Sequence, residues 1–148
     1  MQASGLRPVY LATAQALDGE MAARITHHRE RRGADWVVVE EPLELPEALS
    51  RAAGPDRAVL VDCLTLWLTN VLLAEREPER EADRLLAELA GLAGPAVLVS
   101  NEVGWGVVPA NALARRFADE AGRLHQRVAA VADAVVLVAA GLPLWLKG

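Results

Sequence analysis

The 148 residues suffice for one domain and are too few for two, and a hydrophobic content of 53% excludes an intrinsically disordered chain. The formal net charge of −5 lacks the basic excess needed to bind nucleic acid over a broad face, although a small anionic ligand needs only a few local cations. A single cysteine, Cys63, excludes an internal disulfide and offers no metal-site spacing, and the absence of a charged-then-apolar leader predicts a cytoplasmic protein.

Short, β-branched apolar runs alternate with helical patterns along the chain. The apolar runs lie at residues 9–12, 36–39, 58–61, 96–99 and 134–138. Their continuous rather than alternating apolarity indicates strands buried on both faces, as in a parallel sheet. The helical patterns lie at residues 18–32, 44–53, 63–74, 79–92 and 110–132. This alternation predicts a single α/β domain of the nucleotide-binding type over residues 1–148.

The stretch from Val128 to Leu146 is nearly all apolar, but we do not expect a membrane span there. Asp133 interrupts it, and a glycine and a proline break it again near residue 142. A helix end that runs into a buried strand explains the pattern better. Residues 144–146 are then expected to return as a short antiparallel strand at the edge of the sheet.

Polar residues follow three of the predicted strands, where ligands bind in open α/β sheets. Thr13 comes after the first strand, Asp62 after the third, and Asn101 and Glu102 after the fourth. An apolar run that ends in aspartate is typical of the magnesium-supporting acid of P-loop nucleotide enzymes, although such an aspartate also commonly caps the next helix. Acids at neighbouring strand ends, here Asp62 and Glu102, can share a hydrated cation. Because both strands end in polar residues, we expect Asp62 and Asn101 to lie close together at the carboxyl edge of the sheet.

The segment that continues from Asn101 and Glu102 to residue 109 is rich in glycine. Gly104 and Gly106 permit a close approach of a ligand to the main chain. Two interpretations stay open: a turn in which Trp105 fills the core, or a loop that holds a substrate against Asn101 and Glu102.

A histidine pair lies on the helical pattern at residues 18–32. At about 100° per residue, His27 shares a stripe with Arg24 and Arg31, whereas His28 leans toward the apolar side. A neutral imidazole can attack phosphorus, and arginines can hold phosphate oxygens. A histidine between arginines is also ordinary on a solvated helix, so the residues alone leave both interpretations open.

Two charged stretches are interpreted mainly as surface. The run at residues 75–84 mixes acids and bases and is expected to be a solvated loop that enters a helix, without a functional role. Arg116, Arg123 and Arg127 recur on one face of the last helix. These arginines form either a phosphate-facing or subunit-facing stripe, or ordinary ion pairs with neighbouring acids.

Taken together, these residues resemble the bifunctional adenosylcobinamide kinase/adenosylcobinamide-phosphate guanylyltransferase family of late cobalamin biosynthesis. Its motifs match in order and spacing at residues 10–15, 18–25, 27–28, 61–70, 100–109, 113–117, 122–124 and 132–133. The resemblance implies a P-loop NTPase-like (RecA-like) three-layer sandwich, with a mainly parallel sheet and an antiparallel edge strand. It also implies phosphorylation of adenosylcobinamide, GMP transfer from GTP to the product, ATP and GTP as substrates, Mg²⁺ as cofactor, and a homo-oligomer.

The resemblance assigns roles to particular residues. It implies that His27, the first of the histidine pair, becomes guanylylated, and that Asp62 supports the metal. It implies nucleotide or phosphate contacts for Thr13, Arg24, Arg31, Glu41, Asn101 and Glu102. The family usually has asparagine where this chain has His125, a departure that we interpret as tolerated.

One further departure concerns the phosphate-binding loop. The family begins with a strand and a Gly-x-x-x-x-Gly-Lys-Ser loop about one helix upstream of Tyr10, and no such motif occurs in these 148 residues. We therefore expect an N-terminally truncated chain without the first strand and P-loop, which binds GTP more weakly than a version that has them. The alternative hypothesis is a non-catalytic remnant of the fold that serves as an oligomeric binding or interaction subunit.

Overall fold

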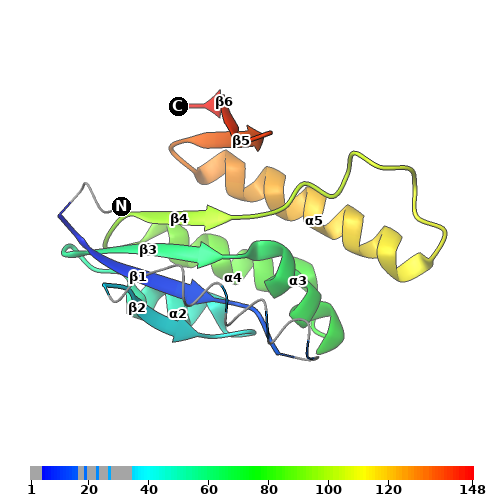
Figure 1. Cartoon of the computed structure of the whole chain (residues 1–148). Helices are drawn as coiled ribbons and strands as arrows, with labels where there is room; N and C mark the ends of the chain where they lie inside the picture. The colour runs from blue at the N-terminus through cyan, green and yellow to red at the C-terminus, as the bar shows by residue number, and fades with distance from the viewer. Residues whose placement is uncertain (1–4, 17–18, 20–22, 24–26, 28–34) are drawn as a thin grey trace.

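Four short strands form a parallel sheet (Figure 1). The computed structural model describes residues 5–16, 19, 23, 27 and 35–148. The strands are β1 (Arg7–Ala12), β2 (Val37–Glu40), β3 (Arg57–Asp62) and β4 (Ala96–Val99), in the order β2-β1-β3-β4. Ala12 pairs with both Glu40 and Asp62, so the carboxyl ends of these strands meet at one edge of the sheet.

The helices between the strands begin and end close to their predicted bounds. They are α2 (Leu45–Ala52), α3 (Leu64–Leu73), α4 (Pro78–Ala90) and α5 (Ala112–Val131). Prolines lie in the first turns of α2 and α4, where a missing N–H costs no helical hydrogen bond. Asn111 caps α5, because its side chain accepts a hydrogen bond from the Ala114 N–H at 2.8 Å.

The predicted helix at residues 18–32 lies mostly outside the described residues. Of its members, Gly19, Ala23 and His27 are described, and all three are helical and exposed. Within the part of the chain that the structure describes, no helix is both long and apolar enough to cross a membrane.

The hydrophobic core lies between the sheet and the helices. α2 packs against β1 and β3, and α4 packs against α2 and α5; α2 and α4 lie behind the sheet in Figure 1. Trp67 of α3 is 1% exposed, and its Nε1–H donates to the Leu43 carbonyl at 2.9 Å, so the one polar atom of this large side chain is satisfied. Fully buried neighbours include Leu11, Leu45, Leu49, Val59, Val61, Val71 and Leu85.

The prediction that every apolar run is buried on both faces is wrong for the outer strands. β1 and β3 are central and largely buried, but Val37 and Val38 of β2 are 57% and 42% exposed. Val97 and Val99 of β4 are 48% and 38% exposed. A run of valines has the same pattern in a central strand and an outer one, so apolarity alone does not distinguish them.

The C-terminal segment forms a separate antiparallel hairpin of β5 (Val135–Ala139) and β6 (Leu142–Lys147). Ala140 and Gly141 join the strands, and both have positive φ, 52° and 77°, as a two-residue type I′ turn requires. The antiparallel strand is therefore confirmed, but two predictions about this segment are wrong: the run at residues 134–138 is not a buried strand of the parallel sheet, and residues 144–146 do not lie at the edge of that sheet. Among the described residues, this pair is not hydrogen bonded to the parallel sheet.

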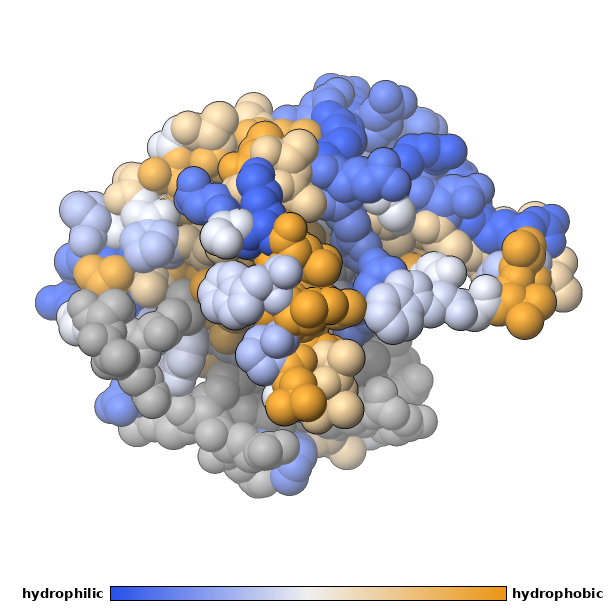
Figure 2. Space-filling view, turned by 90° about the horizontal axis from the view of Figure 1, so that it is seen from above, coloured by the Kyte–Doolittle hydropathy of each residue, from blue (hydrophilic) through white to orange (hydrophobic). Residues whose placement is uncertain are grey.

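Large apolar side chains remain exposed on the hairpin. Among them, Val138, Leu142 and Trp145 are 65%, 71% and 64% exposed. Figure 2 views the molecule from above, the side that carries the hairpin in Figure 1, and hydrophobic residues gather there beside a hydrophilic band. Patches of this kind commonly mark surfaces that contact another protein.

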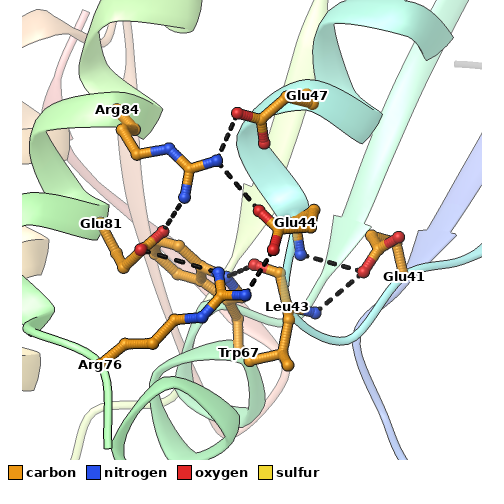
Figure 3. Close-up of polar contacts among 8 residues, drawn as sticks. All are labelled: Glu41, Leu43, Glu44, Glu47, Trp67, Arg76, Glu81 and Arg84. Atoms are coloured by element: carbon orange, nitrogen blue, oxygen red, sulfur yellow. Dashed lines mark hydrogen bonds and ion pairs between the residues drawn. The ribbon is translucent and has the colours of Figure 1, made fainter. Parts of the chain in front are cut away.

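A network of five charged side chains joins α2 to α4 and to the turn before it (Figure 3). Arg84 binds Glu44 at 2.9 Å and Glu81 at 2.5 Å, and also binds Glu47. Arg76 binds Glu44 at 2.5 Å. Hydrogen bonds from Arg76 and Arg84 lower the pKa of Glu44 to about 2.

This network corrects one part of the prediction that residues 75–84 are a solvated loop that enters a helix: the helix is present, but its acids are not all solvated. Pro78 begins α4 there, and Glu81 is only 6% exposed. A buried carboxylate is costly unless it is paired, and the two arginines supply the pairing. Mixed charge in a sequence does not distinguish a solvated run from one whose acids and bases pair across helices.

Candidate functional site

Polar residues that follow β3 and β4 meet at the carboxyl edge of the sheet. The two strands are parallel neighbours, with Asp62 beside Val99. The Asn101 side-chain amide donates to Thr65 Oγ1 at 2.8 Å and lies 3.9 Å from Cys63 Sγ, in the residue after Asp62. Asp62 and Asn101 therefore lie at the same carboxyl edge of the sheet, as expected.

Thr13, at the end of β1, holds the backbone that follows Asp62. Its side chain is 0% exposed, and its Oγ1 donates to the Cys63 carbonyl and accepts from the Cys63 N–H, both at 2.8 Å. The Thr13 N–H donates to the Asp62 carbonyl at 3.1 Å, and the Asp62–Cys63 peptide bond is cis. The nucleotide contact expected of Thr13 stays a prediction, while its hydroxyl clearly fixes the peptide beside Asp62.

Asn70 of α3 ties two strand-end loops together, which sequence reasoning did not anticipate. Its side-chain amide is 7% exposed and donates to the Thr13 carbonyl at 2.8 Å and to the Pro42 carbonyl at 3.0 Å. An amide on a mainly apolar helix was the available signal, because buried amides require partners.

Tyr10 orients the carboxylate of Asp62. Its hydroxyl donates to Asp62 Oδ2, and its ring, 6% exposed, packs edge-on against Trp36 with centroids 6.1 Å apart. Tyr10 and Ala12 project from the same face of β1, and Ala12 pairs with Asp62, so Tyr10 lies diagonally opposite the carboxylate. This contact follows from the strand register, which the sequence alone does not specify.

The edge offers few ligands for a metal. Among the described residues, no group of three or more His, Cys, Asp or Glu side chains gathers in a way that could hold an ion. Mg²⁺ nevertheless needs only one or two carboxylates when substrate phosphates and water supply the other ligands. Asp62, oriented by Tyr10 at a strand end, fits that mode, and its metal-supporting role stays a prediction.

The loop between β4 and α5 projects away from the core. Trp105 is 74% exposed, and Val107 and Val108 are 95% and 76% exposed; the loop extends beyond the end of the sheet in Figure 1. The interpretation in which Trp105 fills the core is therefore wrong. The other interpretation, a loop that holds a substrate against Asn101 and Glu102, stays a prediction.

His125 connects this loop to α5, which we did not expect from the sequence. Its Nδ1 lies 3.2 Å from Glu102 Oε1, and its Nε2 lies 2.6 Å from Ser100 Oγ. On α5 it follows Leu124, which is 4% exposed, and lies one turn after Ala121, which is 0% exposed. That position beside the buried face was the available signal that the side chain has partners.

Glu41 lies at the same carboxyl edge, directly after β2. Its Oε1 accepts hydrogen bonds from the N–H groups of Leu43 and Glu44 at 3.1 and 2.9 Å, which orders the entry to α2 (Figure 3). The nucleotide contact expected of Glu41 stays a prediction.

The structure places the remaining predicted site residues only in part. His27 is helical and exposed. Arg24 and Arg31, the expected phosphate ligands on its stripe, lie outside the described residues, as does His28.

The arginines of α5 make the contacts expected of a paired surface. Arg123 binds Glu120 at 2.8 Å, and Arg127 binds Asp83 of α4. Pairing within this helix and between α4 and α5 favours the interpretation as ion pairs over a phosphate-facing stripe.

Comparisons with known proteins match nearly the whole chain to one family. The family model for cobinamide kinase / cobinamide phosphate guanyltransferase matches residues 1–146. The chain is 53% identical to the bifunctional adenosylcobalamin biosynthesis protein CobP of Pseudomonas aeruginosa, over 98% of this chain and 85% of that protein. It is 42% identical to the bifunctional adenosylcobalamin biosynthesis protein CobU of Salmonella typhimurium and 39% identical to that of Escherichia coli, each over 94% of this chain and 85% of the relative.

Proposed function

Because the chain belongs to the cobinamide kinase / cobinamide phosphate guanyltransferase family, we propose that it phosphorylates adenosylcobinamide and transfers GMP from GTP to the product. The match over residues 1–146 carries this proposal. The polar carboxyl edge supports it, since substrates of open α/β sheets bind at that edge. ATP and GTP are the nucleotide substrates in this account.

His27 is the nucleophile of the GMP transfer. Its imidazole nitrogen attacks the α-phosphorus of GTP, so that an N–P bond forms while the P–O bond to pyrophosphate breaks. A phosphate oxygen of adenosylcobinamide phosphate then attacks the same phosphorus and displaces His27. Arg24 and Arg31 neutralise the phosphate oxygens in both steps. The exposure of His27 supports this role, because a nucleotide can reach it.

The carboxyl edge binds the nucleotide. Asp62 would hold Mg²⁺, which neutralises charge on the phosphate oxygens when it is bound. Asn101 can both donate and accept hydrogen bonds, so it suits a phosphate or a base. The carboxylates of Glu41 and Glu102 only accept, so they suit the N–H groups of guanine or the hydroxyls of ribose. Thr13 contributes by fixing the peptide after Asp62.

The protein works as a homo-oligomer. The support is the apolar surface on the β5–β6 hairpin, where Leu142 and Trp145 are 71% and 64% exposed. Light scattering coupled to size exclusion tests this, and a monomer at micromolar concentration would contradict it.

Labelling with GTP tests the covalent step. The chain, preceded by a strand and a Gly-x-x-x-x-Gly-Lys-Ser loop, is incubated with GTP and Mg²⁺, and GMP should become attached to His27. The linkage should be acid-labile and alkali-stable, as expected of a phosphoramidate. His27→Ala should abolish the label, and the matched control His28→Ala should largely retain it.

The two histidine variants also separate the two reactions. The kinase step does not use the imidazole, so both variants should phosphorylate adenosylcobinamide at the unsubstituted rate. Label that vanishes only in His28→Ala would move the nucleophile to that residue. Label that persists in both variants would remove the covalent mechanism.

A further inference from the structure

A histidine, a serine and a glutamate form a chain of contacts between β4 and α5. Ser100 directly follows β4, and its Oγ lies 2.6 Å from His125 Nε2. The other ring nitrogen, Nδ1, lies 3.2 Å from Glu102 Oε1. The ring comes from the middle of α5, whereas its two partners lie two residues apart at the start of the exposed loop.

The chemistry of the three side chains determines which atom donates in each of these two hydrogen bonds. An ionised carboxylate can only accept hydrogen bonds. His125 Nδ1 therefore carries a proton, and its N–H donates a hydrogen bond to Glu102. In the neutral ring Nε2 then has a lone pair, which accepts the hydroxyl proton of Ser100. Both ring nitrogens are used, and the tautomer is determined by the partners.

The two residues of this contact differ in exposure and in the support of their backbone. Glu102 has a side chain that is 44% exposed, on a loop whose following residues are also exposed. The His125 side chain is 21% exposed and lies on a 20-residue helix anchored by buried Ala121 and Leu124. The hydrogen bond to His125 restricts the Glu102 side chain to few rotamers, whereas an unbonded glutamate on an exposed loop would adopt several.

We propose that His125 is a positioning residue: it holds the Glu102 carboxylate in its substrate-binding orientation, with Ser100 as the second anchor of the ring. This inference rests on the proposed function, in which Glu102 contacts the nucleotide. His125 touches no substrate itself. Its loss lowers affinity, because Glu102 must then be ordered when the nucleotide binds.

The same three residue types in this order also form the nucleophile, base and orienting acid of serine hydrolases. In a serine hydrolase the buried acid holds the histidine in place. Here the acid, Glu102, is more exposed than His125, so the histidine is the better placed of the two to hold its partner, and the positioning role is favoured. The hydrolase alternative has its own outcome in the test, which is reaction of Ser100 with a fluorophosphonate.

Two amides of different length separate the contacts of the ring. Asn places its side-chain N–H₂ near the position of Nδ1, so His125→Asn retains the donor to Glu102. Gln places its amide near the position of Nε2, so His125→Gln retains only the contact to Ser100. His125→Leu removes both, and Gln126→Leu, at the exposed neighbouring position, is the matched control.

Kinetics of GMP transfer should follow the bond to Glu102. We expect His125→Gln and His125→Leu to raise the KM for GTP about tenfold with kcat within about twofold, since the lost contact acts on binding. His125→Asn and the control should stay within about threefold of the unsubstituted KM. A KM for His125→Asn as high as that for His125→Leu would overturn the proposal, and so would a normal KM for His125→Gln.

A second measurement needs no turnover and therefore separates this inference from the proposed function. Nitrogen-15 spectra of the His125 ring should show the tautomer with the proton on Nδ1, and Glu102→Leu, which removes the acceptor, should abolish that preference. A proton on Nε2 would overturn the proposal even in an active enzyme. Labelling of Ser100 by a fluorophosphonate would overturn it in favour of a nucleophilic serine.

Discussion

Thr13 should be a main determinant of stability at the carboxyl edge, and the atom responsible is its hydroxyl. Thr13→Val retains the shape of the side chain but leaves the buried Cys63 N–H without its partner. The Cys63 carbonyl loses less, because it also accepts from the Trp67 N–H at 3.1 Å. An orphaned buried donor costs about 1–3 kcal/mol, and the weakened carbonyl about 1 kcal/mol more. The free energy of unfolding should therefore fall by about 3 kcal/mol.

Thr13→Ser is the matched control. Serine retains the Oγ and both contacts to Cys63, and it loses one methyl group from a site that is 0% exposed. That loss should cost about 1 kcal/mol. For a domain of this size, the midpoint of thermal unfolding should fall by about 9 °C in Thr13→Val and about 3 °C in Thr13→Ser.

Scanning calorimetry or urea unfolding measures both variants directly. The reasoning is refuted if Thr13→Ser is as destabilised as Thr13→Val, because the methyl group would then matter more than the hydroxyl. It is also refuted if both variants unfold within about 0.5 kcal/mol of the unsubstituted chain, since the contacts to Cys63 would then contribute nothing.

Two further predictions concern charge and the phosphate loop. The pKa of Glu44 falls from 4.5 to about 2, so its stabilisation should be complete above about pH 4.5 and lost as the pH falls toward 2. Because the side chain is 41% exposed, the loss in the free energy of unfolding should be only about 1 kcal/mol. Glu44→Gln, unfolded with urea over the same pH range, should not show this pH-dependent loss. The 148-residue chain should bind GTP orders of magnitude more weakly than a version preceded by a Gly-x-x-x-x-Gly-Lys-Ser loop, because each charge-assisted phosphate contact contributes about 1.5–3 kcal/mol. Equal affinities in calorimetry would contradict this.

Some of the fold could be predicted because local and global signals agree. The runs at β1 and β3 are continuously apolar and central, so their pattern and their burial coincide. Asp62 and Asn101 follow parallel neighbouring strands, and this topology alone brings them to one edge. The helices α2, α4 and α5 begin within two residues of their predicted starts, where the structure has prolines in two first turns and a cap at Asn111.

Other features depend on which elements become neighbours, and no local pattern encodes that. Val97 has the same sequence environment as a buried valine, yet it lies on an outer strand and is 48% exposed. Arg84 pairs with Glu81 on its own helix, but it also binds Glu44 and Glu47 at the start of α2, about 40 residues earlier in the chain. His125 meets Ser100 and Glu102, which lie more than 20 residues earlier in the chain.

The most direct test of the central claim follows one GMP group through both steps. The chain, preceded by the phosphate loop, is incubated with GTP labelled at the α-phosphate and freed of unbound nucleotide. Adenosylcobinamide phosphate is then added without further GTP. The account predicts that the label leaves the protein and appears on the corrinoid in equal amount. Label that stays on the protein, or corrinoid that becomes labelled only when free GTP is present, would contradict transfer through a guanylylated histidine.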